Sequence, residues 1–106
     1  MSLLLNKTGY VRSEKLTKSA EGQPCTMNVA GVCSYDYATT VLAHVDTEDK
    51  GRGIKSSDIA GMYACHKCHE WYDLHKGSEE DRLFYSLRAM VRTQHIMIRE
   101  GLLSVA

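Results

Sequence analysis

Four cysteines constrain this chain more than any other feature of its sequence. Cys65 and Cys68 form a C-x-x-C pair, a spacing at which a tight turn can direct both sulfurs at one metal ion. Cys25 and Cys33 would complete a tetrahedral site of four thiolates, with no cysteine left over. The alternative use of four cysteines is two disulfides, which require an oxidising compartment. The C-x-x-C signature favours a structural zinc ion over disulfides.

The length of the chain predicts one small domain that a bound metal would stabilise. A domain of 106 residues, spanning positions 1–106, buries only about 60–70% of the surface of its unfolded chain. Structural zinc contributes roughly 10–16 kcal/mol of binding free energy that is coupled to folding. The apolar run Leu3-Leu4-Leu5 is too short for a signal peptide, and no run is long enough to span a membrane. We therefore expect a cytoplasmic protein without membrane contact.

The charge balance argues against a protein that coats nucleic acid. The chain has 13 basic and 13 acidic side chains and a formal net charge of zero, whereas proteins that bind nucleic acid by charge alone are usually strongly basic. Any DNA contact would therefore be local. Arg52 and Lys55 are the candidates, because Gly51 and Gly53 in the same loop let the backbone approach a ligand closely.

Residue patterns predict a β-hairpin followed by a helix that carries part of the cysteine cluster. Residues 39–45 are rich in β-branched and apolar side chains and predict a strand, and 60–64 predicts a return strand that leads to Cys65. A helix is expected from about 67 to 75, with Gly77 as the residue just beyond its end.

Two further helices are expected on either side of this unit. A short polar helix within 12–20 would be capped by Ser13, and the longest helix would begin after Ser78, with Asp81 completing a variant capping box. In the longest helix, one stripe of apolar residues is expected to pack on the hairpin as core. The stripe consists of Leu83, Phe84, Leu87, Met90, Val91, Met97 and Ile98. Exposure of Leu87 and Met90 would instead indicate an oligomer interface.

Three side chains outside the cysteine cluster could carry chemistry. His69 and Asp73 are four residues apart, so in a helix that begins near Cys68 they lie one turn apart on one face. An imidazole and a carboxylate in this arrangement suit a second, open site for a hard divalent cation. His44 stands near the end of the first predicted strand. A lone histidine on a strand is usually structural, but here a return strand and a ligand-bearing helix accompany it.

These features together resemble the HNH, or His-Me finger, endonucleases, which have a ββα-metal unit of the same element order. The prophage YbcO-like nuclease family is similar to this chain in three strings: Leu42-Ala43-His44, Gly51-x-Gly53-x-Lys55-x-x-Asp58, and Cys65-x-x-Cys68-His69-x-x-x-Asp73. That family is similar in turn to a phage nuclease that works with RecA filaments. The resemblance extends from about residue 25 to residue 73.

The resemblance implies an α+β fold: a small HNH-like ββα-metal unit stapled by a zinc knuckle of four cysteines, with a long C-terminal helix. It implies a DNA endonuclease of prophage origin that hydrolyses phosphodiester bonds, linked to recombination or DNA processing and to a recombinase filament. By position, His44 would be the general base and Asp58 would orient it. His69 and Asp73 would hold the catalytic cation, Mg²⁺ or similar, and Arg52 and Lys55 would contact the substrate.

Ala43 stands where HNH proteins often have a metal ligand. The resemblance therefore leaves open whether His44 is the base or a ligand.

The competing interpretation is a non-catalytic zinc-ribbon module that binds DNA or protein. It explains the four cysteines and the zero net charge equally well, but it gives no role to His44, His69 and Asp73. The two interpretations differ in their geometry. A nuclease requires these three side chains to converge on one cation, and a separated His44 would favour the module.

Overall fold

The computed structural model describes residues 11–46 and 57–105. The elements in this part of the chain are α2 (Glu14–Ser19), the short 3-10 helix η1 (Tyr37–Thr39), β1 (Val41–His44), the 3-10 helix η2 (Asp58–Ala60), β2 (Gly61–Ala64), α3 (His66–Asp73) and α4 (Glu79–Arg99). The predicted α+β class is confirmed. Arg52 and Lys55 lie outside the described residues, so their contact with DNA stays a prediction.

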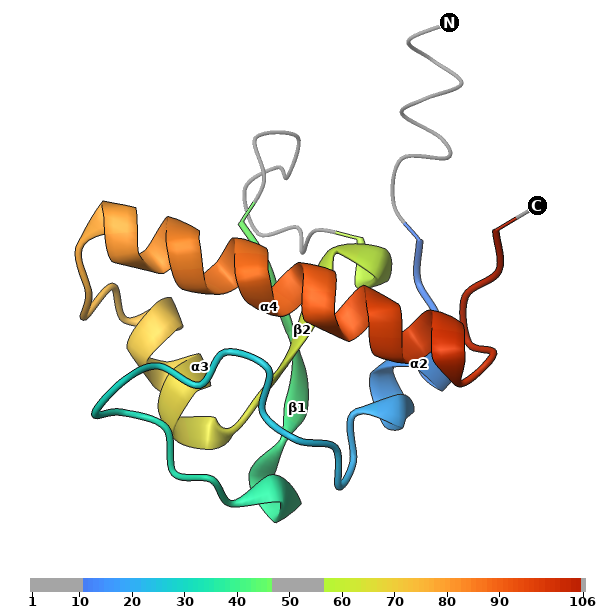
Figure 1. Ribbon diagram of the computed structural model, residues 1–106, viewed down its shortest axis with the longest axis horizontal. Helices are drawn as coiled ribbons and strands as arrows, with labels where there is room; N and C mark the ends of the chain where they lie inside the picture. Colours follow the sequence, from blue (N-terminus) through green and yellow to red (C-terminus); the bar gives the residue numbers. More distant parts are fainter. Residues whose placement is uncertain (1–10, 47–56, 106) are drawn as a thin grey trace, which may run out of the picture.

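The centre of the fold is the antiparallel hairpin of β1 and β2, in which Val41 pairs with Ala64 and His44 with Gly61. Both strands fall within the ranges predicted from the sequence. Figure 1 shows α4 lying across the hairpin, with α3 toward one end of α4 and α2 toward the other.

The hairpin separates two clusters of buried side chains because successive residues of a strand point to opposite faces. One cluster joins the cysteines to α3 and includes Met27, Ala43, Met62, Ala64, Trp71, Tyr72 and Ala89. The other joins the hairpin to α2 and the end of α4, and consists of Leu16, Ala20, Leu42, Tyr63 and Met97. Ala43 and its neighbour Leu42 thus belong to different clusters.

Hydroxyl groups of two threonines bind the backbone of β2 on the side where α4 lies. The Tyr63 amide donates to Thr93 Oγ1 at 2.9 Å, and the Thr26 amide donates to the Tyr63 carbonyl at 2.7 Å. The two threonine hydroxyls lie 3.0 Å apart. Just before Thr93 in α4, Arg88 and Arg92 donate to the carbonyls of Met27 and Thr26. A hydroxyl side chain therefore suits position 93 of α4, because its oxygen accepts the Tyr63 amide.

The predicted core stripe of α4 is wrong for most of its members. Leu83, Phe84, Leu87, Val91 and Ile98 have exposed fractions between 44% and 66%, Met90 is half-buried, and Met97 alone of the stripe is buried. The buried face of α4 consists of Arg82, Ser86, Ala89, Thr93 and Met97. These residues recur every three or four positions, so the period was predicted correctly but the wrong face was chosen.

The helix starts agree with the sequence, whereas one predicted helix end does not. Ser13 Oγ accepts the Leu16 amide at the start of α2, and Ser78 Oγ accepts the Asp81 amide at the start of α4.

At the end of α3, it is His75 that takes the left-handed backbone conformation, at φ 54°, two residues before the predicted Gly77. Gly77 has another role: a side chain there would collide with the Trp71 ring.

Candidate functional site

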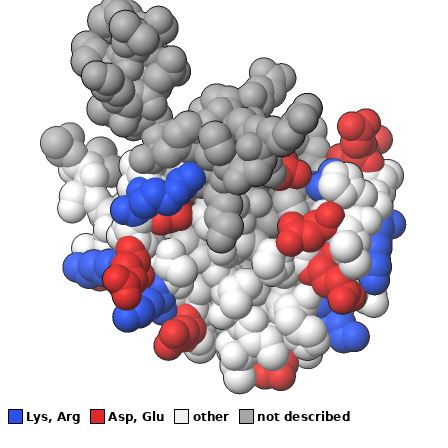
Figure 2. Space-filling view, turned by 180° about the vertical axis from the view of Figure 1, so that it is seen from behind, with Lys and Arg blue, Asp and Glu red and all other residues white. Residues whose placement is uncertain are grey.

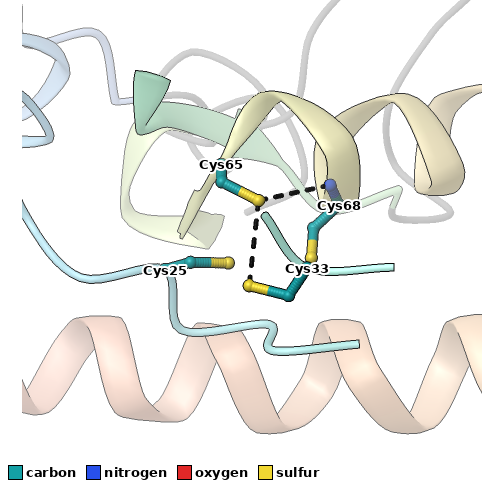
Figure 3. Close-up of side chains that lie close together, drawn as sticks. All are labelled: Cys25, Cys33, Cys65 and Cys68. Carbon is teal, nitrogen blue, oxygen red and sulfur yellow. Dashed lines mark hydrogen bonds between the residues drawn. The ribbon is translucent and has the colours of Figure 1, made fainter. Parts of the chain in front are cut away.

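The four cysteines come from two segments far apart in the sequence and meet at one point (Figure 3). Cys25 and Cys33 lie in the loop that follows α2, Cys65 caps the start of α3, and Cys68 lies in its first turn. The four sulfur atoms all lie within 4.8 Å of one another, and the Cys33 and Cys65 sulfurs are 3.9 Å apart.

This arrangement fits one tetrahedral metal ion. Sulfur atoms about 2.3 Å from a central ion would lie about 3.8 Å from each other, close to the observed Cys33–Cys65 separation. All four cysteines are free rather than joined in disulfides, and three of them are buried. The cluster can therefore hold a metal, as the sequence predicted.

The pKa values of the thiols in the cluster are shifted in opposite directions. A hydrogen bond from the Cys68 thiol lowers the pKa of Cys25 to about 4 and raises the pKa of Cys68 above its ordinary value. Burial raises the pKa of Cys33. Four thiolates at this distance require a cation to offset their charges, and a bound metal ion replaces the protons.

Neighbouring groups orient two of the sulfurs. The Cys68 amide donates to Cys65 Sγ at 3.5 Å, which joins the start of α3 to the cluster. The Asn28 amide group donates to Cys33 Sγ at 3.7 Å. Donors of this kind hold a ligand in place and stabilise its negative charge.

A second candidate site is the buried pair of His44 and Asp58. His44 Nε2 lies 2.8 Å from Asp58 Oδ1, and the exposed fractions of the two side chains are 17% and 6%. The other carboxylate oxygen of Asp58 accepts the Ser13 amide, and the Asp58 amide donates to the Val11 carbonyl. Asp58 is therefore held from both sides.

The pKa of Asp58 agrees with the hydrogen bonds that its carboxylate accepts. Burial acts to raise the pKa of Asp58, but the hydrogen bonds from His44 and the Ser13 amide outweigh it, with help from the charges of His44 and Arg12. The pKa of Asp58 is consequently below its ordinary value, and its carboxylate is the form that the structure stabilises.

The His44–Asp58 pair opens onto a cavity of about 450 Å³. Its lining residues are Arg12, Ser13, Glu14, Thr17, Leu42, His44 and Asp58. The participation of the segment just before α2 was not predicted, because the sequence shows only a helix cap at Ser13 and no sign of its long-range bond to Asp58.

His69 and Asp73 form a third, more exposed pair. His69 Nε2 and Asp73 Oδ2 lie 2.9 Å apart on one face of α3, as their spacing predicted, with exposed fractions of 35% and 57%. A cation from solvent can therefore reach both atoms.

The convergence of His44, His69 and Asp73 on one cleft, around a cation and its water, stays a prediction. Over 11–46 and 57–105, the cysteine cluster is the one group of three or more His, Cys, Asp or Glu ligand atoms close enough to share an ion. Ala43 packs in the cluster beside α3, and the next residue, His44, lines the cavity on the α2 side, as strand alternation requires. The individual roles of the three side chains stay predictions.

Arg82 makes contacts that were not predicted from the sequence. Its Nε donates to the Tyr72 carbonyl at 3.1 Å, its guanidinium lies 4.5 Å from the centre of the Tyr72 ring, and one amine lies 3.5 Å from Asp46. Arg82 thus connects α4 to the end of α3 and to the residue two positions after His44. No sequence signal marks it, since it lies on the helix face that was expected to be solvent-exposed.

The surface charges are mixed. Figure 2 shows Lys and Arg interspersed with Asp and Glu around the face opposite to the view of Figure 1, with uncharged residues between them. This agrees with the formal net charge of zero. Among the described helices, none is long and apolar enough to cross a lipid bilayer.

The chain matches a family model described as "Putative nuclease YbcO" over residues 14–102. It is 35% identical over 91 residues to the "Putative nuclease YbcO" of Escherichia coli strain K12, covering 83% of this chain and 95% of the relative. The protein of the same description from Enterobacteria phage 82 matches equally well.

A solved structure, "Structure of a putative bacteriophage protein from Escherichia coli str. K-12 substr. MG1655", is 31% identical with a TM-score of 0.67. That match covers 81% of this chain and 99% of the other.

Proposed function

Because the chain belongs to the YbcO nuclease family, we propose that it is a metal-dependent DNA endonuclease of the HNH type. The reaction is hydrolysis of a phosphodiester bond. The phosphate carries a negative charge that repels nucleophiles, and the departing sugar oxygen is a poor leaving group. The site must therefore activate water and offset charge on the phosphate.

The observation that carries this proposal is the His44–Asp58 pair at 2.8 Å. A proton on His44 Nε2 that is donated to Asp58 leaves Nδ1 as the basic nitrogen of the ring. That nitrogen can accept a proton from water, and general-base catalysis of this kind typically contributes about 10²–10⁴-fold to a rate. Asp58 acts through His44 by fixing its orientation and tautomer.

His69 and Asp73 are the proposed ligands of the catalytic cation, because their ligand atoms lie 2.9 Å apart and are accessible. A hard ion such as Mg²⁺ is commonly held by one or two carboxylates and keeps its other positions for water and substrate phosphate. When bound, the ion would neutralise a non-bridging phosphate oxygen and the leaving oxygen. Arg52 and Lys55 would add local positive charge for the DNA backbone.

The cysteine cluster is proposed to bind structural zinc. Four thiolates in a closed tetrahedral set are the usual ligands of structural zinc and leave no open coordination position. The ion would hold the start of α3, and with it the position of His69.

Plasmid nicking in the presence of added Mg²⁺ or Mn²⁺ tests the proposal. The wild-type chain, loaded with zinc, should cleave only when the second metal is present, and His44→Ala should lose about 10²–10⁴-fold in rate. His95→Ala is the matched control, since His95 is an exposed histidine on α4 that belongs to neither pair. Equal cleavage by His44→Ala and His95→Ala would exclude His44 as the base. A parallel reaction with a recombinase filament tests the link to recombination.

The non-catalytic zinc-ribbon module is the second candidate, and the position of His44 in a cavity lined by residues of α2 rather than of α3 favours it. This candidate predicts that the zinc-loaded chain binds DNA or protein without cleaving any substrate with any added divalent ion. Binding in the complete absence of nicking would therefore select the module over the nuclease.

A further inference from the structure

The outer face of α4 carries a row of exposed apolar side chains over four turns. Leu83, Phe84, Leu87, Val91 and Ile98 are each roughly half exposed, while the opposite face of the same helix packs on the hairpin. No other described element passes in front of α4 in Figure 1. Single exposed apolar residues are ordinary on a protein surface, but a contiguous row on one helix marks an interaction site.

We propose that this row is the interface of a homodimer in which the α4 helices of two copies pack antiparallel, with a twofold axis beside Val91. The proposal does not depend on the nuclease activity. Its support is the symmetry of the row and the distribution of charge along the helix.

The row is nearly symmetric about Val91. Phe84 lies seven residues before Val91 and Ile98 lies seven residues after it, so each is about two helical turns from the centre. A twofold axis beside Val91 places Phe84 against the partner's Ile98 and does the same in the other half of the interface. An interface between identical surfaces requires self-complementarity of this kind.

The charges on α4 select the antiparallel orientation. Its first turn carries Glu79, Glu80 and Asp81, and its last turn carries Arg99. Antiparallel helices place the acidic turn of each copy near the basic turn of the other and oppose their helix dipoles, whereas parallel helices would bring the acidic turns together. Asp81 and Arg99 are 18 residues apart, which is five turns, and so lie on the same side of the helix.

Phe84 is already held in place for such a contact. Its ring packs edge-on against Tyr85 at 5.2 Å, and the Arg88 guanidinium lies 5.2 Å from its centre. An aromatic side chain that is ordered before association loses little rotamer freedom when it is buried, so Phe84 is suited to anchor the interface.

Sedimentation equilibrium of the full zinc-loaded chain over a range of concentrations tests the proposal. The wild type should form a reversible dimer. Val91→Glu and Val91→Arg should each raise the dissociation constant by about 100-fold or more, because the twofold axis brings two like charges together. An equal mixture of the two variants should form a heterodimer. Leu74→Glu is the control, since Leu74 is an exposed apolar residue that follows α3 and lies outside α4.

The orientation is tested by reversing one charged contact. Arg99→Glu should weaken the dimer, and adding Asp81→Arg to the same chain should restore it. Unchanged metal content and circular dichroism show that each variant is folded. A wild type that remains monomeric at every concentration would overturn the proposal. So would Val91 variants that dimerise like the wild type, or an Arg99→Glu variant that the second change does not rescue.

Discussion

The two His–Asp pairs have the same chemical groups at almost the same distance, 2.8 Å and 2.9 Å, but different structural support. His44 and Asp58 are brought together from β1 and η2 by tertiary structure, and Asp58 is nearly buried. His69 and Asp73 are neighbours on one helix and remain largely accessible. Helical spacing alone can thus produce a contact, but only the folded surroundings fix its orientation and charge.

This difference suits the two proposed roles. A general base must point at one water molecule, so a buried partner that limits its motion is useful. Ligands of a hard cation need open coordination positions and access to solvent, which the second pair has. Three experiments, from the largest expected effect to the smallest, test this difference between the two pairs.

Loss of the structural metal should remove the difference between the two His–Asp pairs, because both pairs depend on the folded domain. Replacing Cys65 by Ser removes a ligand and also the sulfur that caps α3. We expect loss of zinc and of cooperative unfolding, since structural zinc supplies roughly 10–16 kcal/mol that is coupled to folding. Far-UV circular dichroism with measurement of bound zinc checks this. A Cys65→Ser chain that still melts cooperatively would show that the hairpin is stable without the metal.

Removal of each carboxylate should separate the pairs by their contribution to stability. Asp58→Ala leaves the Ser13 amide and His44 without their partner in a buried place, which should lower the free energy of unfolding by about 1–3 kcal/mol. Asp73→Ala removes only an exposed contact and should change it by no more than about 0.5 kcal/mol. Urea unfolding of the zinc-loaded variants gives both values. Equal losses would mean that the buried pair has no special support.

The pH dependence of stability should reveal the lowered pKa of Asp58. A carboxyl group with a lower pKa in the folded state contributes stability at pH values above its ordinary pKa of 3.8, and the contribution disappears as pH falls through the folded value. The stability difference between wild type and Asp58→Asn should therefore be larger above about pH 4 than below it. Comparing the two chains at each pH cancels the shared loss of zinc from the cysteines. A difference that does not change with pH would contradict the lowered pKa.

Features that depend on nearby residues were predicted well from the sequence. The caps at Ser13 and Ser78, the two short strands and the i, i+4 contact within α3 all follow from local spacing. The cysteine cluster joins distant segments, but the number and spacing of cysteines left one complete set of ligands. In these cases the local pattern allows few alternatives.

Features that depend on which face of a helix or strand is buried were predicted poorly. The helical period of α4 is compatible with two faces, and the position of Thr93 beside the Tyr63 amide decided which one was buried. Similarly, the side to which His44 points depends on where α2 and α3 lie relative to the hairpin. Burial of Arg82 and Thr93 in place of leucines reflects hydrogen bonds to partners far away in the chain, which no local pattern records.

The hydrogen bonds that α4 makes to residues 26 and 27 join segments that are synthesised at different times. During translation, all four cysteines are synthesised before the first residue of α4, whereas the bonds from Arg88, Arg92 and Thr93 span more than sixty residues. The native packing of β2 against α4 therefore cannot be complete until most of the last fifth of the chain has been synthesised.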